Sequence, residues 1–172
     1  MQYRGEDFVF YNDEHFTYAF SYNQNFGPTV YIELCIKIED RENIVEWNHT
    51  PESNIVKFAK LLKEKGVPDH MLENLKISLS GLFYKCHNLK NINAFRNFDF
   101  SNVINFSEMF KFCGSLRPNV NENDFDILKV QIVQEKLKNF QADCTGMFDG
   151  AHNYPIPNWV NGRLFEIMWY GH

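Results

Sequence analysis

The feature that most constrains this 172-residue sequence is an internal repeat between Leu79 and Leu116. Four apolar positions recur 27 residues apart in the same order: Leu82 and Met109, Phe83 and Phe110, Cys86 and Cys113, and Leu89 and Leu116. A third, shorter copy runs from Thr145 to Ala151, with Ala151 at the cysteine position. A period in the twenties is typical of leucine-rich-repeat solenoids, whose repeats bury their apolar side chains only by stacking. The pattern therefore predicts a scaffold of stacked repeats and a binding function.

The residues before the repeat alternate between apolar and polar types, as strands do. We expect strands at 8–11, 16–22 and 29–38, with a possible fourth at 44–47. The clearest alternation is in 29–38, where every second residue from Val30 to Ile38 is a β-branched or leucine side chain. This pattern predicts an antiparallel β meander with one solvent-exposed face.

A helix should follow the meander. Thr50 suits its N-cap, Pro51 its first turn, and Gly66 its C-terminal end. Its apolar stripe has helical spacing and consists of Ile55, Phe58, Ala59 and Leu62. A short second helix is expected over 70–75, after Pro68. We expect both helices to cap the stacked repeats.

An insertion separates the second and third copies. Met109 and Met147 are 38 residues apart, and the extra sequence at about 119–140 carries a helical apolar face over 124–140. A strand is the alternative, because Ile127, Val130 and Ile132 favour β structure. Residues 163–170 are predicted to close the far end as a strand.

Together these elements predict an α+β fold, in which an N-terminal antiparallel meander and helix pack on a short leucine-rich-repeat-like solenoid with a helical insert. We divide the chain into a β-rich part with capping helices, residues 1–75, and a repeat part, residues 76–172. Both parts should form one compact unit, since 172 residues suit a single domain.

The second copy and the residues before it, Asn97–Leu116, resemble the BspA-like leucine-rich-repeat family of bacterial proteins. The family's repeats read approximately N-F/W-D-T-S-N-V-T-N-M-S-x-M-F, followed by x-x-C-x-x-L, and this stretch matches in register. With its weaker flanking copies, the resemblance covers about residues 75–160. It implies a repeat fold used for adhesion and other protein contacts, without catalytic residues. The chain differs from typical members in its small number of repeats, its β-rich front and its lack of an export signal.

The charge balance narrows the class of partner. The net charge is −5 and the pI about 5.7, which disfavours nucleic acids and anionic membranes and favours a basic protein. The N-terminus, polar and acidic, does not resemble a signal peptide, and no apolar run approaches a membrane span. Four cysteines without CxxC spacing are expected to stay reduced, so we predict a cytoplasmic protein.

No residue pattern predicts a metal site, a cofactor or an enzyme. The six histidines lack ligand spacing, and the sequence contains no nucleophile, zinc or phosphate-loop motif. The only local combination suited to nucleophilic catalysis is Cys144 with His152 and Asp149. We interpret Cys144 as a core residue instead, because it aligns with Phe106 in the repeat.

The predicted partner-binding surface combines aromatic and acidic residues of the front sheet with an acidic loop. These residues are Tyr11, Asp13, Glu14, Tyr18, Tyr22, Tyr31, Glu33, Glu122, Asp124 and Asp126. Aromatic residues concentrate binding energy at interfaces, and carboxylates select a cationic partner. An alternative interpretation packs the tyrosine rings beneath the helix.

Three functional hypotheses follow. The leading one is a small inhibitor or immunity-type protein that occludes a basic surface of a toxin or enzyme. The alternative is a fragment of a bacterial surface or adhesion protein. The third is a cysteine-dependent enzyme acting through Cys144, which the missing motifs disfavour.

Overall fold

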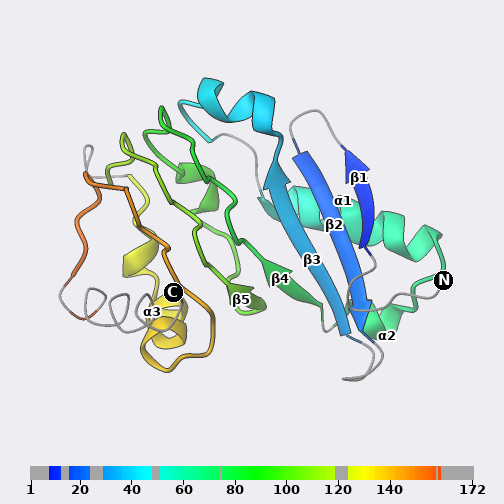
Figure 1. The fold of residues 1–172 in the computed structure, drawn as a ribbon. Helices are drawn as coiled ribbons and strands as arrows, with labels where there is room; N and C mark the ends of the chain where they lie inside the picture. The colour runs from blue at the N-terminus through cyan, green and yellow to red at the C-terminus, as the bar shows by residue number, and fades with distance from the viewer. Residues whose placement is uncertain are drawn as a thin grey trace.

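The structure is a computed structural model that describes residues 8–12, 16–23, 29–47, 51–73, 75–118, 124–157 and 159. Its centre is one five-stranded sheet in the order β1-β2-β3-β4-β5 (Figure 1). The strands are β1 (Phe8–Asn12), β2 (Phe16–Asn23), β3 (Thr29–Ile36), β4 (Lys76–Ser78) and β5 (Val103–Asn105). The α-helices are α1 (Pro51–Glu64), α2 (Asp69–Leu72) and α3 (Gln131–Lys138), and the 3-10 helices are η1 (Ile38–Asn43), η2 (Asn93–Phe95) and η3 (Ile127–Lys129).

The sheet is mixed, which overturns the expected architecture. β1, β2 and β3 pair antiparallel, but β3, β4 and β5 pair parallel, with Ile32 opposite Ile77 and Ile77 opposite Val103. Parallel pairing requires a crossover, and the chain makes it through η1, α1 and α2 between β3 and β4. The prediction of an antiparallel meander packed on a leucine-rich-repeat-like solenoid is therefore wrong. The strands that lead into the repeats extend the front sheet instead of forming a second body against it.

One face of β3 builds the front half of the core. The alternating residues Val30, Ile32, Leu34 and Ile36 are all buried, as their spacing predicts. Helix α1 crosses behind the front strands in Figure 1, and its stripe residues Ile55, Phe58 and Leu62 belong to the same buried cluster. Burial of each such side chain contributes about 1.5–3 kcal/mol. The packing of the apolar stripe of α1 against the apolar face of β3 therefore determines this half of the fold.

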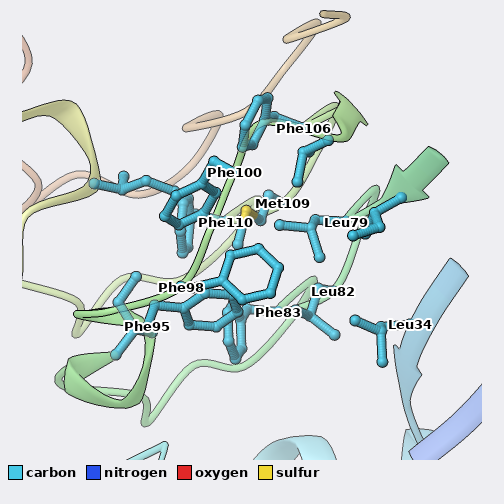
Figure 2. Packing of buried hydrophobic residues seen from close by; sticks show 14 of the residues in the cluster. Leu34, Leu79, Leu82, Phe83, Phe95, Phe98, Phe100, Phe106, Met109 and Phe110 are labelled. Carbon is cyan, nitrogen blue, oxygen red and sulfur yellow. The ribbon is translucent and has the colours of Figure 1, made fainter. Parts of the chain in front are cut away.

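Directly after β4, β5 and the bridge residue Asp143, the repeats form three stacked turns, 79–86, 106–113 and 144–151. Equivalent aromatic rings lie one above another: Phe83 and Phe110 are stacked at 5.7 Å between centroids, and Phe110 and Phe148 at 5.3 Å. Figure 2 shows Leu79, Leu82, Phe83, Met109 and Phe110 packed together in the same apolar cluster as Leu34 of β3. The predicted burial of Cys86 and Cys113 is confirmed, since both are 0% exposed.

The three turns share backbone features as well as side chains. In each copy, a side-chain oxygen at the same position accepts a hydrogen bond from the backbone N–H two residues later. Ser78 accepts from Ser80 (3.3 Å), Asn105 from Ser107 (2.8 Å) and Asp143 from Thr145 (2.9 Å). Such bonds are typical of residues that initiate turns. Two further positions in each copy have a positive φ, at 81, 108 and 146 and at 85, 112 and 150. The repeat therefore specifies a backbone path, not only an apolar pattern.

Other expected elements differ in extent. The insert contains η3 and α3, so its helix is shorter than the 124–140 stretch. The fourth strand considered over 44–47 is only a single β-bridge, between Glu46 and Asn91. The second helix, expected over 70–75, is α2 at Asp69–Leu72. The predicted closing strand at 163–170 and the capping residue Thr50 lie outside the described residues. Within the described ranges, no helix has the length and apolar character needed to cross a membrane.

Candidate functional site

The candidate site is an exposed segment between β3 and α1, Ile38–Glu46, which we call the acidic ridge. It carries four carboxylates, on Glu39, Asp40, Glu42 and Glu46, and one guanidinium, on Arg41. Two large apolar side chains are also exposed on it, Ile38 at 84% and Val45 at 43%. Exposed apolar groups set among carboxylates suit contact with a cationic protein surface.

Arg41 fixes the ridge to the first stacked turn. Its Nη1 donates to the carbonyl oxygens of Gly81, Leu82 and Tyr84 at 3.1, 3.3 and 2.6 Å. Hydrogen bonds from a charged donor are stronger than neutral ones. The positive charge of the ridge is therefore directed into the protein, whereas Glu39, Glu42 and Glu46 are exposed.

The rest of the ridge is fixed by the loop after the first turn. Asn88 Nδ2 donates to the Glu42 carbonyl at 2.7 Å, and the Lys90 N–H donates to the Val45 carbonyl at 2.7 Å. Trp47, which follows the ridge, is buried and meets the Phe83 ring edge-on at 5.3 Å. A segment held this way loses little conformational freedom on binding, which favours affinity.

A polar pocket of about 370 Å³ adjoins the end of the ridge. Its lining residues come from the ridge, the segments that follow the three turns and the start of the insert: Glu46, Lys90, Asn91, Ser115, Arg117, Asp124 and Asn153. Two carboxylates and two cations share the lining with amide and hydroxyl groups. Such a mixture suits a ligand group that both donates and accepts hydrogen bonds.

The tyrosines predicted to bind a partner lie on the front strands. Tyr11 of β1 pairs with Tyr18 of β2, and the register places Tyr18 and Tyr22 opposite Leu34 and Val30. The side chains of the three tyrosines, and all of Asp13, Glu14 and Glu122, lie outside the described residues.

The other predicted residues divide between three places. Tyr31 and Glu33 are half-buried on β3, and the Cys35 thiol donates to Glu33 Oε1 at 3.5 Å. Asp124 lines the pocket and accepts from Asn93 Nδ2 at 3.1 Å.

Asp126, by contrast, is buried. Its Oδ1 accepts from the Leu128 N–H at 3.0 Å and from the Tyr154 hydroxyl at 2.6 Å, and burial beside this carboxylate raises the pKa of Tyr154. This carboxylate connects η3 to the end of the third turn, and is therefore placed to stabilise the fold.

The thiols are in environments that keep them protonated. Burial raises the pKa of Cys86 to about 11 and, together with the charge of Glu33, raises that of Cys35 to about 12. Cys113 donates to the Phe83 carbonyl at 2.9 Å, and burial raises its pKa as well. Reactivity requires the thiolate, so these three groups are poor nucleophiles.

The combination suited to catalysis is not assembled in a cleft. Cys144 is only 1% exposed, at the core position that its alignment with Phe106 predicts, whereas Asp149 and His152 are exposed. Across the part of the chain that the structure describes, no group of three or more His, Cys, Asp or Glu residues could hold a metal ion.

Sequence reasoning missed the ridge. The available signal was the close spacing of four carboxylates around Ile38 and Val45, which resembles an ordinary turn between a strand and a helix. Comparison with protein-family models, with curated proteins and with solved structures finds no match to this chain. The resemblance of Asn97–Leu116 to the BspA-like family therefore stays a prediction.

Proposed function

We propose that this protein is a non-enzymatic binding protein that neutralises a toxin or enzyme by covering a basic surface on it. The observation that supports this most is the acidic ridge. Its carboxylates and its exposed Ile38 and Val45 point to a cationic partner, and Arg41 secures it to the stacked turns. Inhibition by occlusion requires a rigid surface of complementary charge and no chemistry of its own.

The pocket beside Glu46 gives the proposed interface a recessed centre. A standard interface buries about 800 Å² and involves roughly 20–30 residues on each partner, more than the nine residues of the ridge, so the partner would extend over Lys90 and Arg117 at the pocket. Anchoring residues concentrate in such recesses. We expect one polar side chain of the partner to enter the pocket and lysine or arginine side chains to contact Glu39 and Glu42.

The proposal places the protein in the cytoplasm. All four cysteines are present as free thiols, which suits a reducing compartment. A protein that neutralises a toxin would act where that toxin is made or arrives.

Charge reversal on the ridge tests the proposed function. Tagged wild-type protein and the Glu39→Lys/Glu42→Lys variant would be used for capture from the source cell, with Glu64→Lys/Glu73→Lys as the control. All four residues are exposed carboxylates, so both variants change the net charge equally. We expect a basic protein that the wild type and the control retain and the ridge variant releases, with binding that weakens as salt increases.

The captured protein must also lose its own activity when the wild type binds it. Capture that survives reversal of the ridge charges, or a partner whose activity is unchanged in the complex, would contradict occlusion by the ridge.

A further inference from the structure

The stacked turns are joined by a hydrogen-bond ladder that runs in one direction. Alternate N–H groups of the first turn donate to carbonyls of the second, from Gly81 to Ser107, Phe83 to Met109 and Lys85 to Lys111, each at 2.9 Å. The second turn donates to the third in the same way, from Glu108 to Thr145, Phe110 to Met147 and Phe112 to Asp149, at 3.0, 2.9 and 2.8 Å. Each turn therefore has an acceptor edge facing its predecessor and a donor edge facing its successor.

The first turn has no predecessor, and Arg41 takes its place. The guanidinium donates to the carbonyls of Leu82 and Tyr84, which correspond to the acceptors Met109 and Lys111 of the second turn, and also to that of Gly81. One side chain thus serves two of the three acceptor positions at this end of the ladder, Leu82 and Tyr84.

The donor edge at the opposite end is not satisfied in the same way. The N–H groups of Gly146, Phe148 and Gly150 correspond to the donors of the first and second turns, and in the described part of the chain they have no hydrogen-bond acceptor. Backbone N–H groups of folded proteins almost always have a hydrogen-bond partner, so a row of three such donors is suited to receive carbonyl oxygens.

We propose that the donor edge of the third turn binds an extended main-chain segment of a basic partner protein. Alternate carbonyls of that segment would accept hydrogen bonds from Gly146, Phe148 and Gly150, as in recognition by addition of a strand to an open edge. Residues 141–157 contain Asp143 and Asp149, both exposed, and no lysine or arginine, although Lys111 Nζ lies 3.9 Å from Asp149 Oδ2. The local charge therefore favours a segment rich in lysine or arginine.

A second copy of this chain is a poorer occupant. The segment best shaped to continue the ladder is the first turn of another molecule, but Arg41 covers the carbonyls of that turn. The capped end thus disfavours the head-to-tail contact that would otherwise propagate into a filament. The donor edge belongs to the third turn and the ridge is attached to the first, so this proposal does not depend on the ridge.

Amide exchange on ¹⁵N-labelled protein tests the donor edge. The probe is a capped eight-residue peptide of alternating lysine and valine, and the control peptide carries glutamate in place of lysine. We expect the amides of Gly146, Phe148 and Gly150 to exchange rapidly in the free protein and at least tenfold more slowly with the lysine peptide. The amides of Glu108, Phe110 and Phe112 already have acceptors and should not change.

A matched pair of variants separates charge from backbone recognition. Asp143→Asn should weaken peptide binding several-fold, whereas Asp99→Asn should not, although Asp99 accepts from Ser101 as Asp143 does from Thr145. Three results would overturn the proposal. They are slow exchange of the three amides in the free protein, unchanged exchange at millimolar peptide, and equal protection by the glutamate peptide.

Discussion

The closest steric constraint in the stacked turns is the contact between Gly150 and Phe112, and it leads to a quantitative prediction. Gly150 has a φ of +74°, and a Cβ added to it would lie 2.5 Å from Phe112 Cδ1. Gly146 has a φ of +65°, but a Cβ there would meet only Glu108 Cγ, at an ordinary 3.5 Å. Gly146→Ala should therefore lower the free energy of unfolding by about 1 kcal/mol, the cost of a left-handed alanine. Gly150→Ala adds a steric clash of about 1–3 kcal/mol, for a total of about 2–4 kcal/mol.

A double-mutant cycle isolates the clash. In a Phe112→Ala background the ring is absent, so Gly150→Ala should cost only about 1 kcal/mol, and the coupling energy should be about 1–3 kcal/mol. Urea denaturation followed by tryptophan fluorescence measures all four proteins, and equal m-values would show that the transition itself is unchanged. A coupling energy near zero, or equal costs for Gly146→Ala and Gly150→Ala, would refute the packing argument.

Three further predictions concern single residues. Glu108→Gly should stabilise the protein by about 0.5–1 kcal/mol in the same assay, because Glu108 has a φ of 55° and its ion pair with Lys111 is exposed and weak. Arg41→Ala should destabilise by about 2–3 kcal/mol and Arg41→Lys by less, because lysine keeps a charged donor but has a shorter side chain; a cost equal to that of the exposed Arg96→Ala would contradict this. Cys86 has a folded pKa of about 11 against an ordinary 9.0, so its contribution to stability is complete below pH 9 and lost as the pH rises to about 11. Cys86→Ala should make the stability profile shallower over that interval, and an unchanged slope would contradict it.

The sequence predicted the contacts of the repeat better than its architecture. The 27-residue spacing places Phe83 on Phe110 and Cys86 with Cys113 in the core, because equivalent positions of stacked turns must share a layer. The same spacing contains no information on strand direction. β4 and β5 are three residues each, too short for a period-2 pattern. β4 pairs parallel with β3 and β5 pairs parallel with β4, and the first of these pairings depends on the crossover through α1.

The candidate site was less accessible to sequence reasoning, for a physical reason. Arg41 contacts the loop of Gly81, 40 residues away, and nothing in its local sequence distinguishes it from a solvated charge in a turn. Asp126 shows the reverse problem: it lies in an acidic stretch that resembles a surface loop, yet its carboxylate is buried against Tyr154. A run of charged residues predicts that a segment is exposed to solvent. Whether one particular carboxylate in it is buried depends on a hydrogen-bond donor that is distant in the sequence.

The non-glycine residues with a left-handed backbone in the stacked turns are of two kinds, those whose conformational cost is offset by packing and those whose cost is not. Three of the six are not glycine, namely Lys85, Glu108 and Phe112, and each costs about 1 kcal/mol against a typical total stability of about 5–15 kcal/mol. Phe112 offsets its cost, because its ring covers Gly150 and lies 5.8 Å from the ring of Tyr84. Glu108 does not, since its exposed ion pair with Lys111 is worth a few tenths of a kcal/mol. Packing therefore explains why a bulky residue occupies position 112, but not why glutamate occupies position 108, and the stability gained by Glu108→Gly measures that difference directly.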